Sequence, residues 1–136
     1  RVNAWESRWP LNTYRDKNRA GLSKIMLDRL AKAESMTIDD YRAALADRVH
    51  MRAAYAKLAT IADAAITLSA TGAAPLGLQS TGNPVFAAPG SALGVPAISL
   101  PLLADEGLPL GLQVMGYEQK DTALIATAAW LRDTLG

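Results

Sequence analysis

Apolar side chains in the first part of the chain, residues 1–62, recur mostly at helical spacing. Within two segments, residues 23–33 and 38–61, they fall close to one stripe, which predicts two amphipathic helices. Ahead of these, residues 1–19 carry two tryptophans four positions apart and an internal proline, a pattern that predicts an irregular or kinked helix. We therefore expect the first part of the chain to be helical.

Polar residues mark where the helices should begin. Ser23 is suited to cap the helix that follows it. Thr37, with Asp40 three positions later, resembles a capping box in which aspartate stands in for the more usual glutamate. Asn83, followed by a proline, could cap a further short helix that ends near Leu93.

The second part of the chain changes to short apolar runs bounded by proline and glycine. Runs of this length predict buried strands over residues 63–69, 97–103 and 110–115. The polar link at residues 104–107 ends in glycine and predicts a hairpin loop between the last two strands. A last helix is expected over residues 122–135, and the aspartate before it either caps or opens that helix.

The expected order is helix, helix, helix, strand, long loop, strand, strand, helix. This pattern predicts an α/β fold class: a fragment of a mixed sheet, with about three strands, flanked by helices. We expect residues 1–136 to form a single unit, helical over residues 1–62 and made of a strand, a loop, a hairpin and a helix over residues 63–136. Near-continuous apolar strands need cover on both faces, so these strands suggest a segment of a larger sheet.

Composition narrows the function classes. The net charge of +1 gives no electrostatic case for a nucleic acid or an anionic membrane as partner. The chain has no cysteine, which excludes disulfides, cysteine nucleophiles and thiolate metal sites, and no apolar run approaches the ~20 residues that span a bilayer. We expect a cytoplasmic protein. The chain begins at Arg1 rather than at a methionine, which indicates processing, an engineered start or the tail of something longer.

No motif in the chain can carry out a reaction alone. His50 is the only histidine and has no acidic residue three or four positions after it, so we expect no metal site there. The paired acids at residues 39–40 and 105–106 lie where helix caps and turns favour acids. No serine lies in a G-x-S-x-G elbow or near a sequence partner that would act as its base, and Ser99, inside a predicted strand, is expected to be structural. We therefore predict no catalytic residue and no metal ligand.

Four segments of the second part form a long, ordered motif. TGNPVF at residues 81–86 is followed by LGVPAISLP at residues 93–101, GLPLGLQVMG at residues 107–116 and DTALI at residues 121–125. This series resembles the C-terminal end of the amidase signature family. The resemblance extends more loosely upstream, through residues 63–75 and the outline of the helices before them.

The resemblance implies an α/β protein with a large mixed sheet flanked by helices. Family members hydrolyse amides, and some transfer ammonia or hydrolyse esters or ureas. Their chemistry uses a serine nucleophile, a second serine in a cis peptide and a lysine as the ultimate base, with backbone N–H groups stabilising the oxyanion. No metal or organic cofactor is implied. The Gly-Gly-Ser-Ser-Gly-Gly-like nucleophile motif and the lysine segment are absent from this sequence, so no position inherits a catalytic role.

The segment at residues 81–86 resembles one near the substrate cleft of the family. Thr81, Asn83 and Phe86 are therefore the predicted substrate-binding residues. For Asn83 the alternative is a helix cap, and for Phe86 it is a core position. Gly90 departs from the family pattern, in which many members carry a bulky aromatic residue, and this changes the expected shape of the local pocket.

Two functions remain open from the sequence. In the first, the chain is the C-terminal part of an amide hydrolase that acts on a small amide, completes the sheet and the cleft of its parent protein, and is inactive alone. Because a sheet cut through its middle exposes unpaired edges, we expect a homo-oligomer. In the second, the chain is a stand-alone, non-catalytic binding or oligomerisation module, with Trp5, Trp9 and Trp130 as a possible interface.

Overall fold

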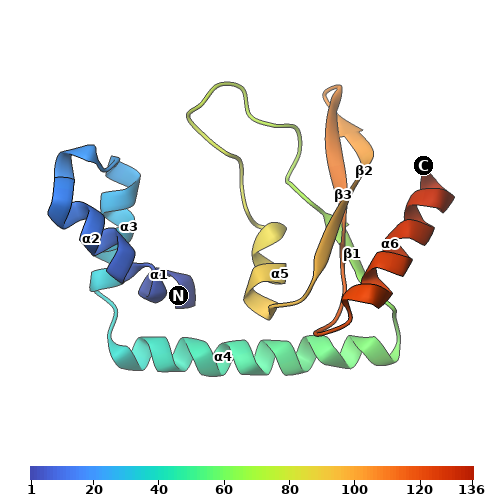
Figure 1. The fold of residues 1–136 in the computed structure, drawn as a ribbon, viewed down its shortest axis with the longest axis horizontal. Helices are drawn as coiled ribbons and strands as arrows, with labels where there is room; N and C mark the ends of the chain where they lie inside the picture. Colours follow the sequence, from blue (N-terminus) through green and yellow to red (C-terminus); the bar gives the residue numbers. More distant parts are fainter. The chain divides into compact units, whose positions relative to one another are not determined.

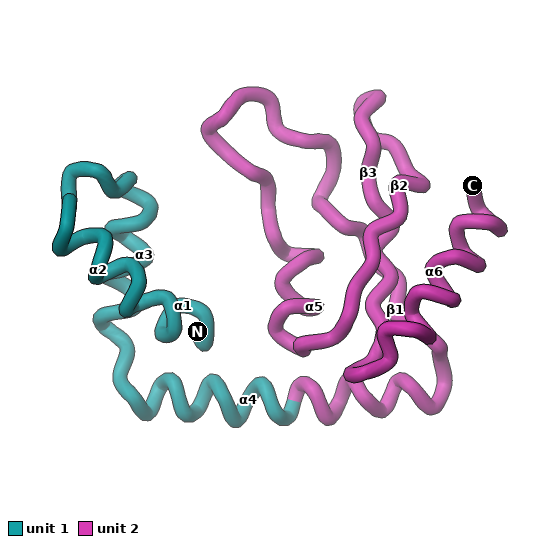
Figure 2. Tube along the Cα trace, in the orientation of Figure 1, with its two compact units in different colours: residues 1–50 teal, residues 51–136 magenta.

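A computed structural model describes all of residues 1–136 and confirms the α/β fold class and the order of its elements (Figure 1). The chain divides into two compact units, residues 1–50 and 51–136 (Figure 2). The elements are α1 (Val2–Glu6), α2 (Arg8–Asn18), α3 (Lys24–Glu34), α4 (Ile38–Ala56), β1 (Ala65–Leu68), α5 (Ala87–Leu93), β2 (Ala97–Asp105), β3 (Leu108–Met115) and α6 (Asp121–Leu135), with 3-10 turns at Arg19–Gly21 and Lys57–Thr60.

The first unit begins with the predicted broken helix. The break lies at Ser7, between α1 and α2, and not at Pro10, because Pro10 falls in the first turn of α2 where its missing N–H has no helical partner to lose. Trp5 stacks on Tyr41 with a distance of 5.3 Å between ring centroids, and the guanidinium of Arg8 lies 4.4 Å from the Trp5 ring. This stack joins α1 to α4.

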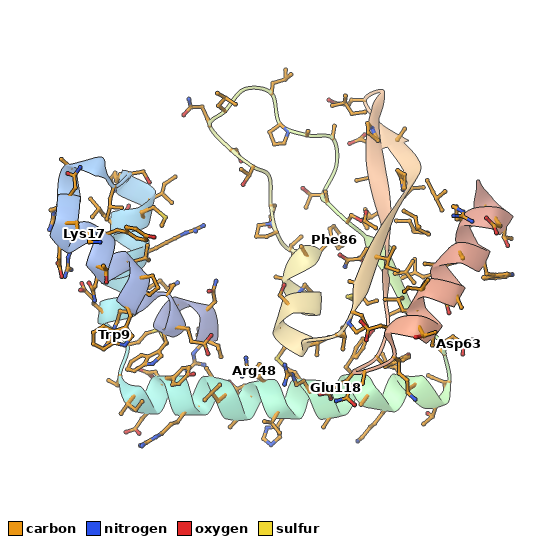
Figure 3. The ribbon with its side chains drawn as sticks, viewed as in Figure 1. Trp9, Lys17, Arg48, Asp63, Phe86 and Glu118 are labelled. Atoms are coloured by element: carbon orange, nitrogen blue, oxygen red, sulfur yellow. The ribbon has the colours of Figure 1, made fainter.

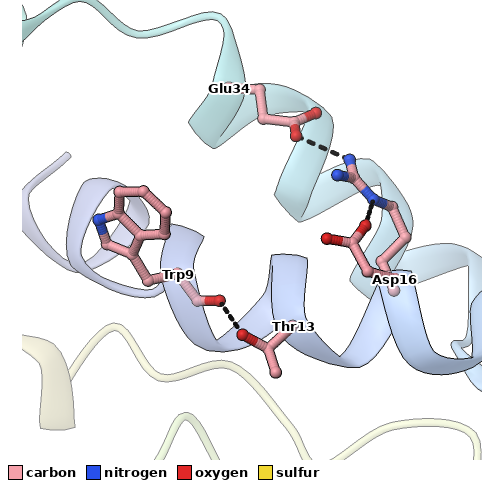
Figure 4. Close-up of polar contacts among 5 residues, drawn as sticks. Trp9, Thr13, Asp16 and Glu34 are labelled. Atoms are coloured by element: carbon pink, nitrogen blue, oxygen red, sulfur yellow. Dashed lines mark hydrogen bonds and ion pairs between the residues drawn. The ribbon is translucent and has the colours of Figure 1, made fainter.

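Helices α2 and α3 are linked by an ion pair, and each carries a buried leucine. Leu11 on α2 and Leu30 on α3 are buried. At the surface, Arg15 Nη1 lies 2.7 Å from Glu34 Oε1, and Arg15 Nε lies 3.2 Å from Asp16 Oδ1 (Figure 4). Because exposed ion pairs contribute little to stability, the burial of these leucines stabilises the first unit more than the ion pair does.

The predicted capping box at the start of α4 is present. The Thr37 N–H donates to Asp40 Oδ2 at 2.8 Å, and the Asp40 N–H donates to Thr37 Oγ1 at 3.1 Å. Ser23 likewise caps α3 by accepting from the Met26 N–H. These local signals were readable in the sequence because each needs only a few neighbouring residues.

The Asp40 cap makes helix stability depend on pH. Hydrogen bonds from the Thr37 backbone and side chain lower the pKa of Asp40, and Arg1 lowers it further. The ionised Asp40 therefore makes its full contribution to the free energy of unfolding above the unfolded pKa of about 4. This contribution is lost as the pH falls through the lower pKa of the folded state. We expect thermal melts followed by circular dichroism to show this loss of stability as the pH falls from about 4 to about 2. The Asp40→Asn substitution should remove the part of the loss that Asp40 causes. An unchanged acid profile in Asp40→Asn, compared with Asp39→Asn as control, would contradict the assignment.

The second unit contains a three-stranded antiparallel sheet in the order β1-β3-β2. In the register, Val114 on β3 lies opposite Ile66 on β1 and Ile98 on β2. Helix α6 packs on this face. The hydrophobic cluster comprises Leu100, Val114, Leu124, Ala128 and Leu131, with Ala64, Ile98 and Leu102 packed against it.

The hairpin between β2 and β3 is tighter than the sequence suggested. Asp105 pairs with Leu108, so only Glu106 and Gly107 connect the strands. Both have positive φ, 50° and 76°, which is the conformation that a two-residue hairpin turn with the right strand twist requires. The predicted four-residue loop was too long because Ala104 and Asp105 continue the strand.

Two predicted helix boundaries also differ from the structure. Helix α4 ends at Ala56 and continues as a 3-10 turn, rather than as an α-helix to Ile61. Helix α6 begins at Asp121, one residue before the predicted start, so Asp121 opens the helix, which was one of its two predicted roles, and does not cap it through its side chain. None of the helices combines the length and the apolar composition that a membrane-spanning helix requires.

Candidate functional site

The predicted substrate-binding residues lie in the loop of residues 73–86, between β1 and α5 (Figure 1). Thr81 and Asn83 are exposed, and Phe86 is half-buried. Figure 3 shows Phe86 at the start of α5, where the loop meets the helix. All three residues thus lie in one segment, at the end of the loop and directly before α5.

Asn83 does not cap α5. Its Oδ1 accepts a hydrogen bond from the Val85 N–H at 3.1 Å, and the residue that precedes the first helical turn is Phe86. The hydrogen bond is local, between a side chain and the backbone two residues later, which is the Asx-turn arrangement typical of asparagine in loops. Since the turn at residues 84–86 is not α-helical, the helix begins later than the sequence predicted.

Phe86 is attached to the sheet by Gln113, which was not among the residues predicted for the site. The Gln113 side-chain amide donates from Nε2 to the Phe86 carbonyl oxygen at 2.9 Å. Gln113 lies on β3 and is 8% exposed, the one polar residue among the buried positions. In the sequence, a glutamine within an otherwise apolar strand indicates a buried polar group that needs a hydrogen-bond partner.

The other end of the loop is attached as well. The Ala73 N–H donates to the Asp105 carboxylate at 2.8 Å, and Asp105 is the last residue of β2. The segment between Ala73 and Phe86 therefore joins the sheet at two points. This arrangement fixes where the loop that carries Thr81 and Asn83 leaves the sheet and returns to it.

The sheet face opposite α6 carries a row of polar side chains. Gln113 lies directly opposite Thr67 on β1 and Ser99 on β2, so the three share one face. Ser69, just beyond β1, joins them through a hydrogen bond of 2.6 Å between its Oγ and the Oγ of Ser99. We call these four residues, Thr67, Ser69, Ser99 and Gln113, the polar face.

Two solved structures share the fold of this chain. A solved amidase matches 98% of the chain with a TM-score of 0.82 and 28% sequence identity, and the chain covers 33% of it. A bacterial aryl acylamidase of the amidase signature enzymes matches 98% of the chain with a TM-score of 0.76 and 15% identity, and the chain covers 32% of it. The resemblance to the amidase signature family is confirmed.

Curated sequences agree over a shorter stretch. The chain is 42% identical over 55 residues to a glutamyl-tRNA(Gln) amidotransferase subunit from Wolbachia sp. subsp. Drosophila simulans (strain wRi) and to one from Wolbachia pipientis wMel, covering 40% of this chain and 11% of each of those proteins. The chain thus spans about a tenth of the length of these curated relatives and about a third of the solved amidases. No family model matches it.

Gly90 is where this chain departs from the pattern of the family that it resembles. It is buried in α5, and a Cβ placed there would lie 3.8 Å from both the Ala97 side chain and Met115 Sδ. Alanine therefore fits, while a bulky aromatic side chain would need the space that Ala97 and Met115 now line. Helix α5 approaches the strands closely because residue 90 is small.

The chain also has a hollow beyond the C-terminal end of β3. It has a volume of about 420 Å³ and its walls include Tyr55, Tyr117, Arg52 and Lys120. The Tyr55 hydroxyl donates to the Met115 carbonyl at 3.1 Å, and burial raises the pKa of Tyr55. None of the predicted substrate-binding residues lines this hollow, and the structure brings no group of three or more His, Asp or Glu side chains together for a metal ion.

Proposed function

We propose that the chain is the C-terminal part of an amidase, a hydrolase that acts on carbon–nitrogen bonds other than peptide bonds. The observation that supports this most strongly is the match of 98% of the chain to one third of a solved amidase at 28% identity. The family resemblance of residues 81–116 points in the same direction and suggests the C-terminal position.

In the parent protein, the reaction follows the family's acyl-enzyme route. A serine hydroxyl attacks the amide carbonyl, the C–N bond breaks, and ammonia leaves with the proton that the serine has given up. Water then hydrolyses the serine ester to release the carboxylic acid and regenerate the hydroxyl. We propose that the serine pair and the lysine lie in the part of the parent protein that precedes this sequence, because their motifs do not occur in it.

Within that protein, this chain extends the sheet and contributes one wall of the substrate cleft. Its loop carries Thr81 and Asn83 as exposed polar groups and ends at the anchored Phe86. Cleft residues are often carried by loops that a rigid scaffold positions, and the attachments at Ala73 and Phe86 provide such a scaffold. The substrate is a small amide.

We also propose that residues 1–136, when isolated, form a homo-oligomer. Strands β1 and β2 are the two edges of the sheet, and Trp130 on α6 is 63% exposed. Unpaired strand edges and exposed apolar surface favour association. Light scattering of purified residues 1–136 tests the proposal: a mass that is a multiple of the chain mass supports it, and a monomer contradicts it.

Ammonia release tests the proposed activity. The full-length protein should release ammonia from simple aliphatic amides such as butanamide, and purified residues 1–136 should release none above background. Turnover by the isolated chain would show that it contains its own nucleophile, contrary to the proposal. A full-length protein that leaves a panel of small amides intact would contradict the amidase function itself.

A further inference from the structure

The two faces of the sheet differ in chemistry. The face under α6 is apolar and includes the buried Leu100 and Val114. The polar face on the other side carries hydroxyl and amide groups on the same three strands. Near one end of this face α5 lies against Ala97 and Met115, so the polar groups border a covering helix and its loop rather than an entirely open surface.

A glycine makes room for the hydroxyl pair on this face. Ser69 and Ser99 stand on opposite sides of β3, and their hydroxyls meet above Gly111. A Cβ at residue 111 would overlap both hydroxyl oxygens. The absence of a side chain there allows the two groups to come within 2.6 Å of each other.

The hydroxyl pair lies between the two attachments of the loop. Along β3, the order is Leu108 opposite Asp105, then Gly111 beneath the hydroxyls, then Gln113 bonded to Phe86. The loop that carries the predicted substrate-binding residues therefore leaves the sheet at one side of the pair and returns at the other.

The four side chains of the polar face are uncharged. Asp105 is the one titratable residue on the three strands, and its carboxylate already accepts from the Ala73 N–H. Two hydroxyls that share one hydrogen bond keep one free proton and unused lone pairs, so the pair can donate to a ligand and accept from it. A neutral group that has both a carbonyl oxygen and an N–H matches this pattern, whereas a carboxylate or an ammonium group matches only half of it.

We propose that the Ser69–Ser99 pair binds a neutral hydrogen-bonding group, such as a carboxamide, on the acyl portion of the substrate. This inference deepens the proposed function and rests on it for the identity of the ligand as a substrate. It assigns the pair to substrate selection and not to chemistry, since neither serine has a base beside it. The amidase should then prefer acyl chains that end in such a group over purely aliphatic ones.

Saturation-transfer NMR with the full-length protein tests this, because it reports ligand contact whether or not the ligand is turned over. Butanamide and succinamide are the probes, since succinamide replaces the methyl group of butanamide with a second carboxamide. We expect tighter binding of succinamide, and a loss of about 5-fold in its affinity in Ser99→Ala and in Ser69→Ala, with butanamide unaffected. Ser99→Thr, which keeps the hydroxyl, should retain the preference.

Ser91→Ala is the matched control, because Ser91 is exposed on α5 and lies outside the polar face. Thermal melts of each variant show whether it folds, and Ser69→Ala serves if Ser99→Ala does not. Equal affinity for the two probes, or a succinamide preference that survives both alanine substitutions, would overturn the inference. The full-length protein could also bind succinamide with the serine-dependent preference but release no ammonia. That result would contradict the proposed function and leave the binding role of the serine pair standing.

Discussion

Replacing Leu124 by alanine is expected to lower the free energy of unfolding by about 2–5 kcal/mol. Leu124 is 2% exposed and lies in the cluster that joins α6 to the sheet, beside Val114. Removing its side chain takes apolar area out of the core and leaves a cavity that a packed helix and sheet can only partly close.

Ile125 provides the matched control for this experiment. It is the next residue on the same helix but is 61% exposed, so alanine there removes few contacts and keeps the helix propensity high. Urea titrations of the two variants should therefore differ clearly in the midpoint of unfolding. Equal losses would mean that α6 does not pack on the sheet through Leu124.

Replacing Gly111 by alanine is expected to cost about 1–3 kcal/mol, because the new methyl group overlaps the Ser69 and Ser99 hydroxyls. The strand must shift or the hydroxyl pair must separate. Gly90→Ala is the control, and it should leave the free energy of unfolding unchanged or raise it. A Cβ at residue 90 would lie at an ordinary contact distance of 3.8 Å from its neighbours, and alanine favours a helix over glycine.

A double substitution separates the overlap from other causes. In the Ser99→Ala background, Gly111→Ala should cost less than it does alone, because one of the two overlapping oxygens is gone. The Ser69 side chain remains close to residue 111, so the recovery should be partial. Strict additivity in thermal unfolding would show that the hydroxyls do not sit above Gly111.

The elements that the sequence predicted well are those with local causes. The Thr37–Asp40 capping box and the cap at Ser23 each depend on residues within one helical turn, and both were found. The tight turn at Gly107 was only partly predicted, because whether Ala104 and Asp105 extend the strand depends on their partners in β3. Strand length is decided by pairing, which the sequence pattern does not contain.

The connections that organise the candidate site come from residues far apart in the sequence. Gln113 and Phe86 are 27 positions apart, and Ser69 and Ser99 are 30 apart. Their contacts arise from the register of β3 between its two neighbours, so no local motif announces them. The family resemblance pointed to Thr81, Asn83 and Phe86, but the structure was needed to show how their loop is held.

We propose that this chain is part of an amide hydrolase whose nucleophile lies outside these 136 residues. A fluorophosphonate probe tests it directly, because an activated serine displaces fluoride and keeps the phosphonyl group. The full-length protein is labelled, digested and mapped by mass spectrometry. We expect one labelled serine, located outside residues 1–136. Labelling of a serine within this sequence, whether Ser69, Ser99 or another, would contradict it.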